Sequence, residues 1–271
     1  MDNDASGISA RSRGLLTRLI ARGREFVSVD DAASRLDLGR VEAAKLLARW
    51  AEQGWLRRVR RGLYVAVPIN AEHPDQWSAD PLVAATMVWS PCYFTGWTAA
   101  NYWGLTDQVF QTIVVRTAAR VRSREQTLLN QKYLVSSVSK ADLEWGVRPV
   151  WLSGTKVSMA DEPRVVVDVL DDPRIGGGIR HGADILLSYL AEHDRALLLT
   201  YADRLGNGAV VKRLGYLCEH LGLADEPFLE ACERRLSAGV ALLDPSARAG
   251  GARNARWRVR VNVGVERVEP S

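Results

Sequence analysis

The sequence predicts an α+β protein, in which an amino-terminal winged helix-turn-helix domain precedes a mixed α+β domain with a small sheet and a helical end. Three observations predict this fold class. Residues 28–67 follow the order helix, turn, helix and β-hairpin; residues 109–157 hold short β-rich runs; and from Met159 onward apolar residues recur with a helical period.

Length and composition are compatible with two domains. The chain has 271 residues, of which 47% are hydrophobic and 25% charged, as in ordinary folded proteins. We expect a winged helix-turn-helix domain at 1–70 and an α+β domain at 80–271, with a polar, proline-containing linker at 68–79. No apolar run approaches the roughly 20 residues needed to cross a bilayer, and the first residues lack the pattern of a secretory signal. A cytoplasmic location without membrane contact is therefore expected.

The amino-terminal domain is predicted to begin with a helix between Ser9 and Gly23 and a short strand at Phe26–Val27. Ser28 followed by Asp31 resembles a capping box, which predicts the start of a second helix. The third helix carries Ala43, Leu46, Leu47 and Trp50 at spacings of three and four, and this apolar stripe should be buried.

The opposite face of the third helix alternates small and cationic side chains, an arrangement that suits a DNA major groove. Two β-rich runs then enclose a basic tip that contains Gly62, as in the wing of a winged helix. Between Arg40 and Arg61 there are seven basic residues against two acidic ones, whereas the net charge of the whole chain is only +4. The positive charge is thus concentrated where a nucleic-acid footprint would lie.

The candidate residues for binding double-stranded DNA are Arg40, Lys45, Arg49, Arg57, Arg58, Arg60 and Arg61. We expect the first three to face the major groove, with Arg49 nearer the backbone, and the others to hold phosphates or enter the minor groove. A generic helix pair with solvated arginines is the alternative.

The second domain is predicted to open with a helix capped by Asp80 and Pro81. The aromatic-rich segment 90–108 is interpreted as core rather than as a base-stacking platform. Three β-rich runs should form the small sheet: Val109–Val115, Tyr133–Val138 and Val147–Leu152.

A second basic patch is possible between the first two of these runs, although a solvated hairpin explains the same residues. Its members are Arg116, Arg120, Arg122, Arg124 and Lys132.

Five helices are expected at the carboxyl end of the chain, followed by an alternating strand at Ala255–Val261 that returns to the sheet. The expected helices are Glu162–Leu170, Ile179–Ala191, Ala196–Leu205, Ala209–Leu221 and Pro227–Leu236.

Catalytic motifs are weak throughout, so we predict no enzyme, no cofactor and no metal. The triple glycine at Gly176–Gly178 lacks the Gly-Lys-Ser/Thr ending of a phosphate loop. Cys218, His220 and Cys232 lack the paired spacing of a zinc site, and three cysteines predict reduced thiols rather than disulfides. The acidic run from Asp161 to Asp172 has no downstream Glu-x-Lys to complete a nuclease site.

Five local signatures in order resemble the AbiEi antitoxins of bacterial type IV toxin–antitoxin systems. They are the wing ending at Gly62–Val67, the aromatic segment Tyr93–Leu105, Met159–Arg164 leading into Val165–Leu170, Arg213–Leu217, and Trp257-x-x-x-x-Asn262. The resemblance covers nearly the full chain.

This resemblance implies a DNA-binding antitoxin that represses its own operon by binding inverted repeats in the promoter. It also implies a partner, a nucleotidyltransferase-like toxin that modifies tRNA and that the carboxy-terminal domain counteracts. The chain is expected to be a monomer or weak dimer that pairs on DNA. Two alternatives remain: a stand-alone regulator with a ligand-sensing second domain, or a nucleic-acid-modifying enzyme.

Overall fold

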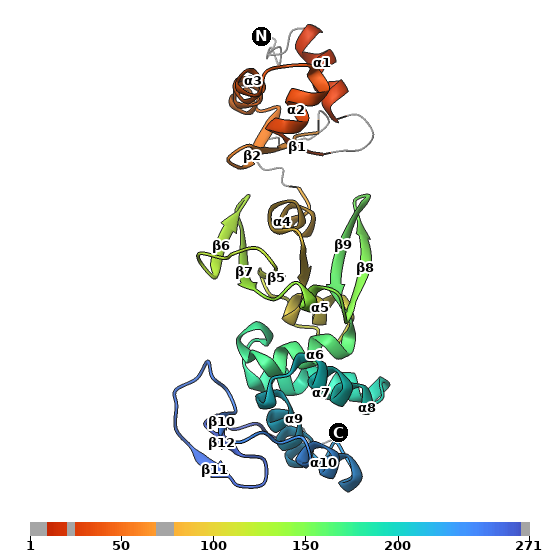
Figure 1. Cartoon of the computed structure of the whole chain (residues 1–271), viewed down its shortest axis with the longest axis vertical. Coiled ribbons are helices and arrows are strands. Elements are labelled where there is room, and N and C mark those ends of the chain that lie inside the picture. The colour runs from red at the N-terminus through yellow and green to blue at the C-terminus, as the bar shows by residue number, and fades with distance from the viewer. Residues whose placement is uncertain (1–9, 21–24, 69–78, 267–271) are drawn as a thin grey trace, which may run out of the picture. The chain divides into compact units, whose positions relative to one another are not determined.

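The computed structural model describes residues 10–20, 25–68 and 79–266 (Figure 1). The chain divides into two compact units: the first comprises residues 1–88, 127–131 and 151–156, and the second comprises the rest. The predicted linker lies outside the described residues apart from its two end positions.

The amino-terminal part folds as the sequence predicts, with three helices and a three-stranded antiparallel sheet in the order β1-β3-β2 (Figure 1). Its elements are α1 (Ala10–Ile20), β1 (Phe26–Ser28), α2 (Val29–Leu36), α3 (Arg40–Glu52), β2 (Leu56–Arg60) and β3 (Leu63–Ala66). This is a winged helix-turn-helix, with β2 and β3 as the wing.

The start of α2 is fixed by the predicted capping box. The Asp31 amide donates to the Ser28 hydroxyl oxygen at 3.0 Å, and the Ser28 amide donates to the Asp31 carboxylate at 3.0 Å. These bonds satisfy two backbone donors that a helix start otherwise leaves unpaired. Asp37, at φ 55°, ends the helix in the left-handed conformation and starts the tight turn into α3.

The core of this domain is built on the apolar stripe of α3. Ala43, Leu47 and Trp50 are fully buried, and Leu46 is nearly so. They pack in one cluster with residues of all the other elements, including Leu56 at the start of the wing. Burying a leucine side chain contributes about 1.5–3 kcal/mol to the stability of the fold. The apolar stripe therefore determines which face of α3 turns inward.

The wing is attached to the rest of the domain at its tip. Gly62 has φ +79°, a conformation that glycine adopts without steric cost, and its carbonyl accepts a hydrogen bond of 3.0 Å from the Val29 amide. The strand register shifts between Arg58 and Arg60, which marks a β-bulge near the tip. The basic tip is therefore held at a fixed distance from the start of α2.

The part of the chain from residue 79 onward, called the second domain below, contains a six-stranded mixed sheet in the order β6-β7-β5-β4-β9-β8. The three predicted runs are present, as β5, β7 and β8, but the sequence did not predict the other three strands. The strands are β4 (Cys92–Phe94), β5 (Thr112–Thr117), β6 (Glu125–Leu128), β7 (Gln131–Ser137), β8 (Val147–Leu152) and β9 (Thr155–Ala160).

The predicted helices of this part are confirmed to within a few residues. The aromatic segment contributes β4 and α5 (Gly96–Tyr102), and Tyr93, Phe94 and Ala100 are fully buried, in keeping with a core role. The other helices are α4 (Pro81–Trp89), α6 (Glu162–Asp171), α7 (Ile179–Glu192), α8 (Ala196–Leu205), α9 (Gly208–Leu221) and α10 (Glu226–Glu233).

The carboxyl end departs from the prediction. Only Val259–Val261 of the alternating segment forms a strand, β12, and it pairs with β10 (Ala241–Leu242) and β11 (Ala252–Asn254) in a separate sheet. Trp257 lies before the strand and is fully buried against Gly215 of α9, where a Cβ atom would overlap its ring. This aromatic anchor, rather than the main sheet, fixes the segment.

Among the described residues, no helix is long and apolar enough to cross a membrane. Cys218 and Cys232 are fully buried free thiols, as predicted. Burial raises the pKa of the Cys232 thiol to about 12, which keeps it protonated and unreactive at neutral pH.

Candidate nucleic-acid interface

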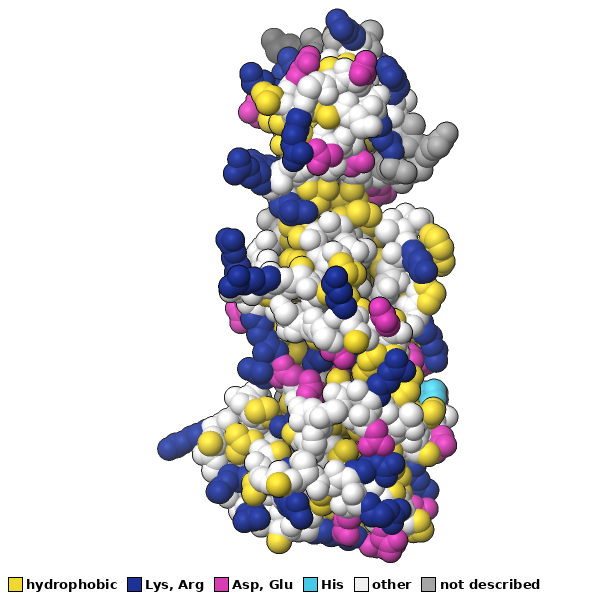
Figure 2. Space-filling view, in the orientation of Figure 1, with side chains coloured by type: hydrophobic (Ala, Val, Ile, Leu, Met, Phe, Trp, Pro, Cys, Tyr) yellow, Lys and Arg dark blue, Asp and Glu magenta, His cyan; other side chains and the backbone are white. Residues whose placement is uncertain are grey.

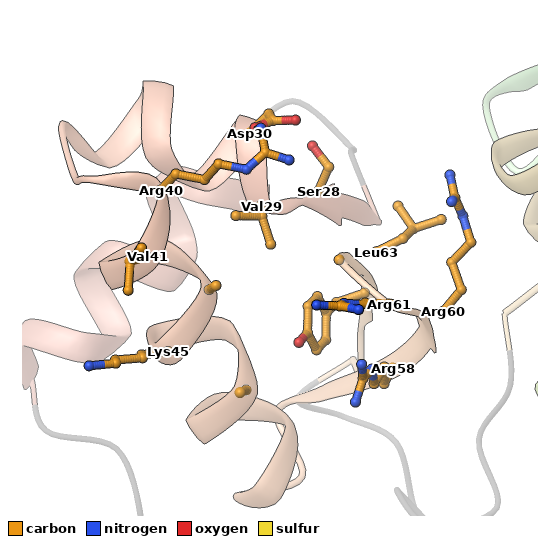
Figure 3. Close-up of a pocket in the computed structure, with 14 residues that line it drawn as sticks. Ser28, Val29, Asp30, Arg40, Val41, Lys45, Arg58, Arg60, Arg61 and Leu63 are labelled. Atoms are coloured by element: carbon orange, nitrogen blue, oxygen red, sulfur yellow. The ribbon is translucent and has the colours of Figure 1, made fainter.

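An open groove separates the outward face of α3 from the wing (Figure 3). The start of α2 closes one end, through Ser28, Val29 and Asp30. The helix contributes Arg40, Val41, Ala44, Lys45 and Ala48, and the wing contributes Arg58, Arg60, Arg61, Gly62, Leu63 and Tyr64.

The side of this groove formed by α3 combines small side chains with two cations, Arg40 at the start of the helix and Lys45 further along it. Ala44 and Ala48 keep the surface of α3 low, while Val41 is 70% exposed. A valine at this exposure stabilises nothing within the domain, but it offers an apolar contact such as a thymine methyl group would accept. The low surface lets another backbone approach α3 closely.

The wing wall carries its cations at the tip, and they do not all point the same way. In Figure 3, the Arg61 side chain reaches back toward α3, whereas Arg60 points away from it. The Lys45 side chain leaves α3 on the side away from the wing. Tyr64 is only 5% exposed and forms part of the base of the groove.

Arg40 and Asp30 form an ion pair at the closed end of the groove, with a distance of 2.8 Å between Arg40 Nη1 and Asp30 Oδ1. Both side chains remain largely exposed, at 75% and 67%. A pair this exposed contributes little to stability, about 0–1 kcal/mol. Its effect is to orient the Arg40 guanidinium over the groove.

A second groove lies along α3 on the side of α1. Arg11, Lys45 and Arg49 supply its positive charge, Glu42 is its acidic residue, and Leu15, Leu38 and Leu46 form its apolar lining with Ser12. Lys45 lines both grooves, so the two grooves flank α3.

Five of the seven predicted DNA-binding residues thus line one groove, with the side chains of Lys45 and Arg60 directed away from its centre (Figure 3). Arg49 lies in the second groove with Arg11, and Arg57 lines neither. Figure 2 shows Lys and Arg side chains projecting from the edge of the amino-terminal domain that carries α3 and β2. Asp30 and Tyr64 were not assigned to the interface from the sequence, because only basic residues were considered as candidates.

The possible second basic patch is corrected by the structure. Arg116 is 6% exposed and lies inside the domain, with its guanidinium 3.3 Å from Asp168 and 3.2 Å from Asp171. Arg124 pairs with Asp172. Arg120, Arg122 and Lys132 remain exposed, so an external patch would consist of these three alone.

Arg164 and Asp168 form the centre of a buried network between α6 and the sheet. Both are fully buried; Arg164 Nε lies 2.9 Å from Asp168 Oδ1, and its guanidinium stacks 3.4 Å from the Trp145 ring centroid. Tyr93 and Thr95 donate hydrogen bonds to the same carboxylate at 3.1 and 2.7 Å. Burial, and then the Asp168 charge, raise the pKa of Tyr93, which keeps its hydroxyl protonated as a donor.

The acidic residues between Asp161 and Asp172, which could suggest a nuclease site, also have hydrogen-bond or ion-pair partners within the domain. Asp161 caps α6 and accepts a hydrogen bond of 2.8 Å from Tyr201, while Asp172 pairs with two arginines. Within the described residues, no group of His, Cys, Asp and Glu side chains could hold a metal ion. The carboxylates contribute to folding rather than to an exposed site.

Comparison with known proteins bears on the winged domain first. Residues 15–67 match the family described as transcriptional regulators of the AbiEi antitoxin type. Over these residues the chain is similar to AbiEi-type regulators. The matched residues include all of α2, α3 and the wing, so the groove lies within the AbiEi-type domain.

The fold of the chain as a whole has a counterpart among solved structures. The crystal structure of the RV2827C protein from Mycobacterium tuberculosis is similar over 94% of this chain and 92% of that one, with a TM-score of 0.68 and 15% sequence identity. At this identity the likeness shows a shared fold. No curated protein matches the chain.

Replacing Asp168 by Asn should strongly destabilise the second domain. The change leaves the Arg164 and Arg116 guanidinium groups buried without their common counter-charge, and breaking such a pair costs about 3–5 kcal/mol. Chemical denaturation monitored by tryptophan fluorescence measures the loss. Asp203→Asn, which removes the partly exposed partner of Arg235, is the control and should cost about 1 kcal/mol or less. Equal, small losses in both variants would contradict a structural role for the network.

Proposed function

We propose that this protein is a DNA-binding antitoxin that represses its own type IV toxin–antitoxin operon and counteracts a nucleotidyltransferase-like toxin. One observation carries the DNA-binding part: the cationic, small-residue face of α3 and the basic wing line one groove in the AbiEi-type domain. The antitoxin part is supported by the family match, which describes an antitoxin regulator.

In this proposal α3 enters the major groove, which at about 12 Å wide admits one helix. Because α3 begins at Arg40, the side chains of Arg40 and Val41 lie at its amino-terminal end, beside the first residues of α2. Ala44 and Ala48 allow the helix to approach the base edges, and Lys45 lies on its other flank. Arg40 would contact a base, and guanine offers two acceptors that match its guanidinium.

The wing would hold the sugar-phosphate backbone beside the helix. Arg58 and Arg61 carry fixed positive charges on a hairpin whose tip is hydrogen-bonded to the start of α2. Phosphate contacts of this type position a protein on the duplex without reading its sequence. In the second groove, Arg11 and Arg49 are placed to meet the backbone on the opposite side of α3.

Binding to inverted repeats follows from one reading helix in each copy of the chain. Two copies, each on one half-site, would cover a two-fold symmetric operator. The exposed groove is complete within one chain, so we propose a monomer or weak dimer that pairs on DNA. Action on an operator places the protein in the cytoplasm.

The affinity for operator DNA should fall steeply with salt. If four or five cations of the two grooves, Arg40 excepted, neutralise phosphates, the logarithm of the association constant falls against the logarithm of salt with a slope of about −4, from roughly −0.9 for each phosphate. Arg61→Ala should reduce the slope by about one and weaken all duplexes alike. Fluorescence anisotropy with DNA from upstream of the gene measures both effects.

The matched control for this experiment is Arg13→Ala, which removes an exposed arginine of α1 that lines neither groove. It should leave slope and affinity unchanged. A salt-independent affinity, or equal losses from both variants, would refute the proposed binding surface.

The antitoxin role predicts growth rescue. Co-expression of this chain should restore growth to cells that express a nucleotidyltransferase encoded beside its gene. A variant with Lys45→Ala and Arg61→Ala should still rescue when both genes are driven by foreign promoters, because toxin neutralisation is assigned to the second domain. Failure of the unmodified chain to rescue would refute the antitoxin role and favour a stand-alone regulator.

A further inference from the structure

The Arg40–Asp30 pair raises a question that the DNA-binding groove alone does not answer. A carboxylate that is 67% exposed lies in a surface otherwise suited to phosphates, where it repels an anionic partner. Like charge at an interface lowers affinity and is usually retained when it excludes a wrong contact. The position of Asp30 therefore suggests that it selects which group the groove binds, rather than increasing the affinity for DNA.

Asp30 has no part in capping its own helix. The capping box of α2 uses Ser28 and Asp31, while Asp30, in the first turn, lies at the rim of the groove beside the Arg40 guanidinium (Figure 3). Its ion-pair partner is Arg40, the first residue of α3. Arg40 is held from outside its own helix, because the carboxylate that pairs with its guanidinium belongs to α2.

We infer that Asp30 is a specificity-determining positioning residue, which holds Arg40 for contact with a guanine and discourages contact with phosphate. This inference rests on the proposed DNA-binding function and names the base that the site reads. The ion pair occupies Nη1 of Arg40, and the guanidinium has five N–H donors in all, so donors remain for the O6 and N7 acceptors of guanine.

Two physical effects give this arrangement its selectivity. A long side chain that is already held by a partner loses less conformational entropy when it binds a base edge, so the correct contact becomes more favourable. A phosphate approaching the same guanidinium meets the negative charge of Asp30, so the sequence-independent contact becomes less favourable. Asp30 thus lowers the affinity for non-cognate duplexes and increases the ratio of cognate to non-cognate affinity.

The test measures dissociation constants for an operator half-site and for each of its single-base-pair substitutions. Arg40→Ala should lose about tenfold or more in discrimination at one base pair, a G·C pair, because a bidentate base contact has that value. Asp30→Asn should lose about two- to fivefold at the same base pair, the range of an exposed ion pair, and should bind the substituted duplexes more tightly than the unmodified protein does.

Two further variants separate positioning from bulk charge. Adding Asp30→Asn to Arg40→Ala should change discrimination no further, because Asp30 acts through Arg40. Glu52→Gln removes one exposed negative charge from the last turn of α3 and lines neither groove, so it should leave discrimination unchanged. Thermal unfolding of each variant confirms that the domain remains folded.

Three outcomes overturn the inference. Discrimination in Asp30→Asn equal to that of the unmodified protein removes any selecting role. Equal gains in affinity from Asp30→Asn and Glu52→Gln on all duplexes reduce the effect of Asp30 to its net charge. A loss that persists in the Arg40→Ala background, at a different base pair, shows that Asp30 contacts a base itself, such as the amino group of cytosine. Absence of DNA binding by the unmodified protein would instead refute the proposed function.

Discussion

The burial of one face of α3 is the constraint on which the proposed interface depends. Leu47 and Trp50 are fully buried, and the cluster that they join includes residues of α1, α2 and the wing. With that face fixed inward, the opposite face of the helix must be presented to solvent. The hydrogen bond from Val29 to the Gly62 carbonyl fixes the wing tip relative to α2, and the groove results from these two restraints together.

The second domain is organised by buried charges instead of by a single apolar stripe. Arg164 is fully buried against Asp168 and Trp145, and Arg213, with its pKa lowered by burial, donates to the carbonyls of Leu170 and Leu242. Several signatures that resembled the AbiEi family are therefore structural. Arg213 and Trp257 join α9 to the small terminal sheet, and Asn262 exchanges hydrogen bonds with the backbone of Asp244. Such networks are costly to break, which restricts sequence change at these positions.

Sequence pattern was sufficient where one physical rule dominated. The spacing of Ala43 to Trp50 predicted α3 and its buried face, and Ser28 with Asp31 predicted the cap of α2. Sequence pattern failed where pairing between distant segments decides the secondary structure. β6 and β9 are short strands with partly polar sequences, so the pattern did not predict them. The alternation before Val261 predicted a longer strand, but it arises from the buried side chain of Trp257. Arg116 resembled its exposed neighbours because its partner Asp168 is 52 residues away in sequence.

The most direct test of the proposed interface is the change in backbone amide NMR chemical shifts when an operator half-site duplex is added to the full chain. The account predicts the largest changes along α3, at the start of α2 and at the wing tip around Arg61, because these segments line one groove. Large changes confined to the second domain, with α3 and the wing unaffected, would contradict it.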